Sequence, residues 1–184
     1  MTRHRWTEHD FIAGDPCLDF LNTVGDTGKS RVIDRLEDRQ ALGDWIRASN
    51  LTDAGSTPQV SERDFDEAIA LRERLHTLFS TIAQGHATTD AWEMVRDSLA
   101  EAVAFSKLAI DEPTPLQVTS HRFRDRMALA ALALLYSGRL HRLKECGRCS
   151  WLFLDQSKAQ RRRWCRTEVC GNRARVERHY HRNH

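Results

Sequence analysis

The sequence of 184 residues has no uninterrupted apolar run near the roughly 18 residues that a membrane-spanning helix needs. Its first residues also lack the apolar core of a secretory signal peptide. These two absences predict a cytoplasmic protein without a membrane partner. Internal repeats and low-complexity tracts are absent as well, and apolar residues make up 40% of the chain. Such a composition is typical of a chain that buries a core and folds.

Signatures of enzymes are missing too. The glycine-containing segment at 25–30 lacks the full spacing of a phosphate-binding P-loop. No nucleophile and base stand in a recognisable catalytic pattern. An enzyme hypothesis would have to use a group of polar residues in the first half of the chain: Asp19, Asn22, Arg72 and His76. We therefore predict that the protein is not an enzyme and has no catalytic residues.

Charge is present in quantity but is divided unevenly along the chain. Residues 1–138 contain 15 Lys and Arg against 22 Asp and Glu, whereas residues 139–184 contain 13 against 4. A short segment with such a cationic surplus is attracted to polyanions, and its acidic neighbour is not. The division at Gly138 predicts a helical domain over 1–138 and a basic module over 139–184 that contacts nucleic acid. The alternative is a basic tail that is merely solvated.

Four of the five cysteines fall inside 25 residues of the basic segment: Cys146, Cys149, Cys165 and Cys170. The first two have the C-x2-C spacing that brings two thiolates to one zinc ion, and the second two supply another pair. Disulfides and unligated thiols are the alternatives, but a cytosolic chain is kept reduced. We expect one structural Zn²⁺, without an open position for catalysis. Cys17, in an apolar run, is interpreted as a buried hydrophobic residue rather than a reactive thiol.

Apolar spacing and capping residues predict helices over 15–25, 38–49, 61–83, from 88 or 89 to about 100, and 121–137. A short β-hairpin is expected between 103–110 and 116–119, with a turn at 111–115 that contains two prolines. Trp151–Leu154 is typical of a strand, and Gly171–Asn172 can begin a helix that ends near Arg182. The predicted fold is mainly α: a multihelical N-terminal domain with a short hairpin, followed by a small treble-clef-like zinc module with four cysteine ligands.

The candidate nucleic-acid contacts are arginines beside the second cysteine pair and on the last helix: Arg161, Arg162, Arg163, Arg173, Arg175, Arg178 and Arg182. In that helix Val176 and Tyr180 share one side, which we expect to pack on the zinc hairpin, while the arginines face phosphates. A solvated tail in which Arg162 or Arg163 pairs with Asp155 is the alternative.

A second candidate site lies in the acidic half. Arg72 stands in the middle of the apolar face of the 61–83 helix, and a buried guanidinium needs a partner. Asp19 and Asn22, one turn apart on the first helix, are the expected partners. The pattern permits an internal salt bridge, or a pocket for a small anionic effector that is lined by Asp19, Asn22, Trp45, Arg72 and His76.

The tail resembles the CGNR zinc finger, through the two cysteine pairs, Trp151–Leu154, and Cys170-Gly171-Asn172-Arg173. The first 138 residues are similar to the ABATE domain, through Gly14-x3-Leu18-Asp19-Phe20-Leu21-Asn22-Thr23, the Trp45-Ile46 helix and Leu71-Arg72-x2-Leu75. The resemblance implies a bacterial stress-induced transcription regulator whose finger binds DNA and whose four cysteines hold the metal. A finger that binds RNA or a protein is the alternative. A homodimer is expected, because one such finger offers little contact area for selecting a DNA site.

Overall fold

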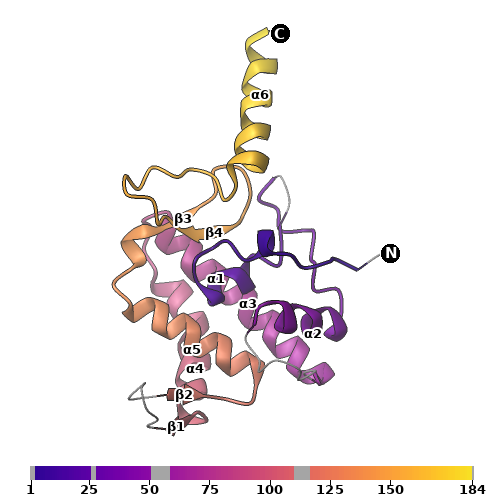
Figure 1. The fold of residues 1–184 in the computed structure, drawn as a ribbon. Helices are drawn as coiled ribbons and strands as arrows, with labels where there is room; N and C mark the ends of the chain where they lie inside the picture. Colours follow the sequence, from indigo (N-terminus) through magenta and orange to yellow (C-terminus); the bar gives the residue numbers. More distant parts are fainter. Residues whose placement is uncertain (1–2, 26–27, 51–58, 110–116, 184) are drawn as a thin grey trace.

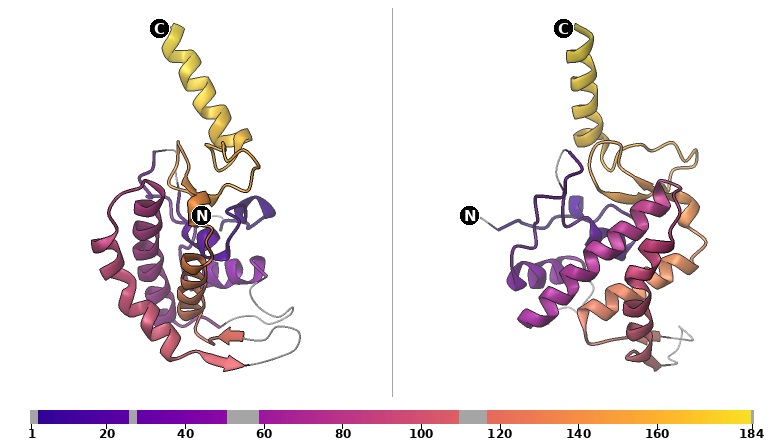
Figure 2. Two further views of the ribbon diagram at one scale, coloured as in Figure 1. Left: turned by 90° about the vertical axis from the view of Figure 1, so that its left-hand side faces the viewer. Right: turned by 180° about the vertical axis from the view of Figure 1, so that it is seen from behind.

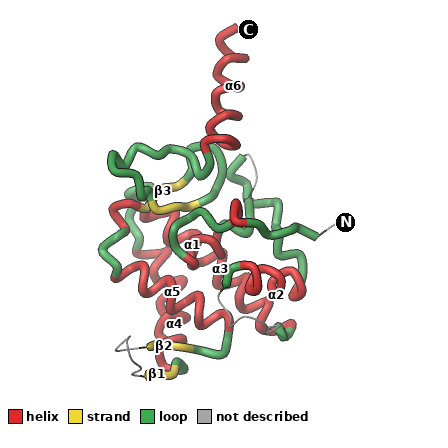
Figure 3. Tube along the Cα trace, in the orientation of Figure 1, coloured by secondary structure: helices red, strands yellow, loops and turns green. Residues whose placement is uncertain are grey.

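The computed structural model describes residues 3–25, 28–50, 59–109 and 117–183. Helices account for most of the body, and the strands are short (Figure 3). The helices in chain order are α1 (Pro16–Leu21), α2 (Arg39–Ala48), α3 (Glu62–Ala83), α4 (Thr89–Ala104), α5 (Phe123–Tyr136) and α6 (Asn172–Asn183). The predicted mainly helical fold is therefore confirmed.

The helices begin where the sequence places a capping side chain. Asp15 accepts a hydrogen bond from the Cys17 amide at the start of α1, and Asp38 and Ser61 accept from amides in the first turns of α2 and α3. Each cap satisfies an amide that has no partner within its own helix. α1 is shorter than predicted, because it ends at Leu21, well before Gly25.

The long helix α3 lies at the centre of the body, where it contacts α1, α4 and α5 (Figure 1). Aromatic side chains fill the core between α1, α2 and α5. The rings of Phe20, Trp45 and Phe123 lie within 5.1–5.8 Å of one another. These tilted and edge-on contacts bury large apolar surfaces, which is the main stabilising contribution here.

Two antiparallel hairpins stand at opposite ends of the body (Figure 1). In the first, β1 (Lys107–Ala109) pairs with β2 (Gln117–Thr119), which confirms the predicted hairpin; its predicted turn lies outside the described residues. In the second, β3 (Leu143–Glu145) pairs with β4 (Leu152–Leu154). This second hairpin carries the cysteine segment.

The β3–β4 hairpin shares the core of the helices rather than lying on their surface. All three residues of β4 are buried, and β3 and β4 both contact α3. The Leu154 amide donates to the Ala13 carbonyl at 2.8 Å, which links β4 to the segment before α1. Whether 1–138 and 139–184 fold independently stays a prediction, and these contacts favour one cooperative unit.

The last helix, α6, stands away from the body in every view (Figures 1 and 2). Val176 is 69% exposed and Tyr180 is 58% exposed. The prediction that this side of the helix packs on the zinc hairpin is therefore wrong. The physical reason is that the apolar side chains of β4 are already buried against α1 and α3, so the hairpin has no apolar face left for α6.

None of the described helices combines the length and the apolar character that crossing a membrane requires.

Candidate metal centre and basic surface

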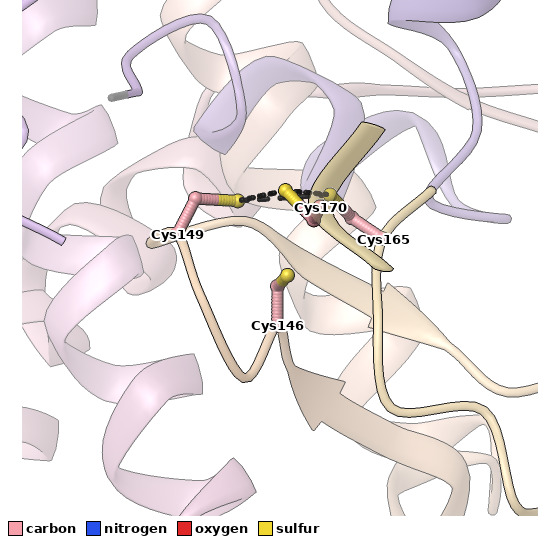
Figure 4. A group of neighbouring side chains, drawn as sticks. All are labelled: Cys146, Cys149, Cys165 and Cys170. Carbon is pink, nitrogen blue, oxygen red and sulfur yellow. Dashed lines mark hydrogen bonds between the residues drawn. The ribbon is translucent and has the colours of Figure 1, made fainter. Parts of the chain in front are cut away.

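The four predicted cysteines come together between the β3–β4 hairpin and the start of α6 (Figure 4). Cys146 follows β3 directly, and its amide donates to the Trp151 carbonyl at 2.8 Å, which closes the knuckle. Cys170 lies in the turn Thr167–Gly171 that leads into α6. All four sulfur atoms lie within 4.8 Å of one another, and all four residues are buried. The local spacing and the tertiary fold therefore bring one sulfur from each cysteine to a common point.

The sulfur geometry fits a tetrahedral zinc ion. The Sγ atoms of Cys149, Cys165 and Cys170 are 3.6, 3.6 and 3.7 Å apart. A tetrahedron with zinc–sulfur bonds of about 2.3 Å has edges of about 3.8 Å, so these three atoms already form one face of it. All five cysteines lie in the described residues, and none forms a disulfide. The cluster is consistent with one structural zinc, which would stabilise the fold of this segment when bound.

Electrostatics gives a second reason for a cation. Hydrogen bonds from the thiols of Cys149 and Cys165 lower the pKa of Cys146. In return, hydrogen bonding with Cys146 raises the pKa of Cys149 to about 12. Among the four sulfurs alone, ionising one therefore disfavours ionising the next. A divalent cation removes this conflict, because it stabilises all four thiolates together.

The knuckle and the loop before Cys165 are held by contacts that require these particular residues. A Cβ atom on Gly147 would lie 2.8 Å from the Trp164 ring, so only glycine lets that ring cover the knuckle. The Gly147 amide donates to the Arg163 carbonyl at 3.0 Å. Asp155 is fully buried and accepts from Lys144 at 2.7 Å. The predicted side-chain pairing of Asp155 with an arginine is therefore wrong.

Comparison with protein families identifies both parts of the chain. Residues 14–138 match the ABATE family, described as "Putative stress-induced transcription regulator". The chain belongs to the ABATE family. Residues 142–183 of this ABATE protein match the CGNR zinc finger, which contains the four-cysteine cluster. No curated protein matches the chain. The two matching families are regulator and zinc-finger families rather than enzyme families.

The arginines that were predicted to contact nucleic acid occupy two neighbouring places. Those of α6 lie on the projecting helix: Arg173, Arg175, Arg178 and Arg182. Arg161 and Arg163 belong to the loop before Cys165. Arg162 is half-buried, because its guanidinium donates to the carbonyls of Trp164 and Cys165 and stacks 4.3 Å from the centre of the Phe153 ring. Arg162 thus holds the ligand loop, and a nucleic-acid contact by it stays a prediction.

The expected partners of Arg72 are not the ones that the structure shows. Arg72 is 2% exposed, and its guanidinium donates to both carboxylate oxygens of Asp34 at 2.9 and 2.5 Å and to the Thr23 hydroxyl at 3.0 Å. Asn22 instead donates to and accepts from the backbone of Leu152, both at 2.8 Å. The prediction that Asp19 and Asn22 answer Arg72 is wrong. The loop that carries Asp34 folds back over α3 and supplies the carboxylate.

The other residues of the predicted effector pocket also have protein partners. Asp19 accepts from the Ala13 amide at 2.9 Å, and His76 Nε2 bonds the Ser150 carbonyl at 2.8 Å. Trp45 lies in the aromatic core with its ring 5.5 Å from that of Phe20. The pockets that open beside the cysteines are lined by other residues. These contacts favour the internal salt bridge and packing role for the group, and the effector role stays a prediction.

Several contributors to this region have no local signal in the sequence. Asp34 and Arg35 lie in an irregular loop, where apolar spacing gives no information about direction. Glu145 is at the end of β3, and its carboxylate accepts from Lys29 at 2.8 Å and from Ser80 at 2.5 Å. Their partners are distant in the sequence, so only the assembled fold identifies them.

A pH dependence follows from Asp19. Burial raises the pKa of this carboxyl to about 7, although the Ala13 amide opposes the shift. Between the ordinary pKa of about 3.9 and this higher value, the folded chain binds a proton that the unfolded chain has lost, so stability falls as pH rises. Relative to Asp19→Asn, the wild type is expected to lose free energy of unfolding from about pH 4 up to about pH 7 in urea titrations. Parallel curves for the two proteins would refute this assignment.

Proposed function

We propose that this ABATE-family protein is a transcription regulator that binds duplex DNA through α6 and the loop before Cys165. The observation that carries the proposal is the position of α6, which stands clear of the body and presents arginines to solvent (Figure 1). An exposed cationic helix of this length can enter the major groove or lie along the phosphates. In this proposal Cys146, Cys149, Cys165 and Cys170 are the zinc ligands, and their role is structural.

The base of α6 is held so that its arginines have a defined position. Cys170 lies just before the helix, and an ion pair joins Arg148 of the knuckle to Glu177 of the helix. The Asn172 side-chain amide donates to the Glu168 carbonyl at 2.9 Å. A helix that is fixed to a metal centre loses less conformational entropy on binding than a flexible tail would.

The arginines of α6 separate into two faces. At about 100° per residue, three arginines share one side of the helix: Arg175, Arg178 and Arg182. They span about 10 Å along the axis, a length that reaches more than one phosphate. Arg173 lies on the opposite side with Val176. We assign phosphate contact to the first face, together with Arg161 and Arg163 of the adjacent loop.

The remaining parts of the proposal concern organisation. Residues 139–184 form the DNA-binding module, and residues 1–138 form the regulatory module that receives an effector. A homodimer would present two α6 helices and double the contact area, which selection of a DNA site requires. These assignments rest on family membership and on the uneven charge of the two segments.

The DNA contact is tested by replacing Arg175, Arg178 and Arg182 together with alanine. We expect affinity for duplex DNA to fall at least about tenfold and the log–log salt slope to decrease by roughly 3, because each lost phosphate contact releases about one counterion fewer. Fluorescence anisotropy across salt concentrations measures both quantities. Arg96→Ala removes an exposed arginine from α4 and serves as the matched control.

Two results would contradict the proposal. Unchanged duplex affinity in the triple variant, with zinc content intact, would place the contact elsewhere. Tighter binding of single-stranded RNA than of duplex DNA at every salt concentration would instead favour the RNA-binding alternative.

A further inference from the structure

A pocket of about 380 Å³ opens between the N-terminal region and the finger, beside the cysteine cluster. One wall comes from the segment 25–35, and the other comes from the finger and the first turn of α6. The size is within the range of sites for small molecules. None of the residues that were predicted to bind an effector lines this pocket, so it is a separate candidate site.

The charged side chains of the pocket are all cationic. Arg35, Arg166 and Arg173 line it, and no carboxylate does among the described residues. In the same described part of the chain, neither Arg166 nor Arg173 forms an ion pair. Arg35 Nη1 is buried without a hydrogen-bond partner, and its nearest carboxylate oxygen, on Asp10, is 3.5 Å away. A buried guanidinium nitrogen without a partner is costly, and an anionic oxygen placed in the pocket would satisfy it.

The rest of the pocket surface is largely apolar. The Arg35 guanidinium carbon lies 5.0 Å from the centre of the Trp151 ring, and Ile33 and Val169 provide aliphatic walls. A Cβ atom on Gly25 would lie 2.6 Å from Trp151 Nε1, so glycine allows the loop to pass over this ring. The pocket therefore offers cationic groups on one side and a flat aromatic surface on the other.

The cysteine cluster sets the charge of the ligand. Cys149, Cys165 and Cys170 also line the pocket. Zinc with four thiolates carries a net charge of roughly −2, which offsets part of the arginine charge. The three guanidinium groups exceed it by one positive charge. We propose that this pocket binds a small organic monoanion, a carboxylate on an apolar or aromatic body, with the carboxylate between the arginines and the body on Trp151.

Such a ligand would connect the two halves of the protein. It would contact Arg35 of the N-terminal region and Arg173 at the base of α6 simultaneously. By linkage, a ligand that prefers one position of α6 changes the affinity of α6 for its own target, and the reverse is also true. This consequence rests on the proposed DNA-binding function, whereas binding of the monoanion does not.

Isothermal titration calorimetry of the full-length, zinc-loaded protein tests the site with acetate, benzoate and 1-naphthoate, with 1-naphthalenemethanol as the neutral analogue and inorganic phosphate as an anion without an apolar body. We expect benzoate or 1-naphthoate to bind once per chain. The neutral alcohol and phosphate should each bind at least about tenfold more weakly, since a charge-assisted hydrogen bond is worth more than about 1.4 kcal/mol. No saturable binding of any carboxylate up to about 10 mM, or equal binding of the alcohol, would overturn the proposal.

Variants distinguish a ligand site from arginines that only balance the thiolates. Arg166→Gln and, separately, Arg173→Gln should weaken binding of the carboxylate at least about tenfold while zinc content stays at one per chain. Arg96→Gln, on α4 and away from the pocket, should bind as the wild type does. If binding is lost only in variants that also lose zinc, the arginines serve the metal centre and the proposal is wrong. These readouts do not involve DNA, so they are independent of the proposed function.

Discussion

Cys149→Ser is expected to abolish stoichiometric zinc binding and to produce the largest loss of stability of any single substitution in this chain. Cys149 supplies one corner of the sulfur face whose edges measure 3.6 and 3.7 Å. In zinc-finger peptides the bound metal contributes about 10–16 kcal/mol, so even partial loss exceeds the effect of an ordinary core substitution. Elemental analysis and chemical denaturation of the purified variant measure the two effects.

The matched control is Cys17→Ala, which removes a fully buried thiol from α1, far from the cluster in sequence. This variant should keep one zinc per chain and lose only about 1 kcal/mol, the usual effect of a small core truncation. Full zinc content in Cys149→Ser would contradict the assignment of this residue as a ligand.

The extent of the unfolding tests how the two segments are coupled. The hairpin shares the core of α1 and α3, so we expect hydrogen exchange in these helices to accelerate when zinc is lost. Acceleration confined to residues 139–184 would instead show that the two segments fold independently, as the division of charge at Gly138 predicts.

Asn22→Ala is expected to destabilise the protein by about 3 kcal/mol, the second large effect, because it leaves buried polar groups without partners. The Asn22 side chain is 2% exposed and satisfies both the amide and the carbonyl of Leu152. Its removal orphans these two backbone groups, each costing about 1–3 kcal/mol. Urea denaturation of the zinc-loaded protein gives the difference, with Gln40→Ala as the control for an exposed amide on α2.

Asn22→Asp provides the sharper test of the mechanism. The carboxylate has the shape of the amide but donates no hydrogen bond when ionised, and it lies against the Leu152 carbonyl. We expect a loss of stability comparable to that of Asn22→Ala. A variant as stable as the wild type would show that the hydrogen bond to the carbonyl contributes nothing.

Much of the local structure could be predicted because it depends on neighbours in the sequence. Asp38 and Ser61 cap helices that begin directly after them, and the apolar spacing of α3 and α5 identified both helices. The interval between Cys146 and Cys149 was enough to predict a metal knuckle, since two residues between thiols allow both to reach one ion. In the same way, the counts of charged residues distinguished the acidic and basic segments without any structure.

The failures concern contacts between segments that are far apart in the chain. Arg72 needed a carboxylate, and chemistry alone could not choose between Asp19, which precedes α3 by many residues, and Asp34 in an irregular loop. Val176 and Tyr180 form an apolar side of α6, yet that side stays exposed because the hairpin was already buried. In both places the competing partners had suitable chemistry, and only packing decided between them.

The amino-acid sequence by itself determined which segments become helices, which four sulfurs are spaced for an ion, and where positive charge accumulates. These properties arise from interactions over a few residues or from composition. The tertiary structure alone decided that Asn22 closes on Leu152, that α6 projects from the body, and that Arg35 meets Arg173 across a pocket. Such pairings depend on how whole elements bury their apolar faces, and burial of that kind is a property of the assembled chain.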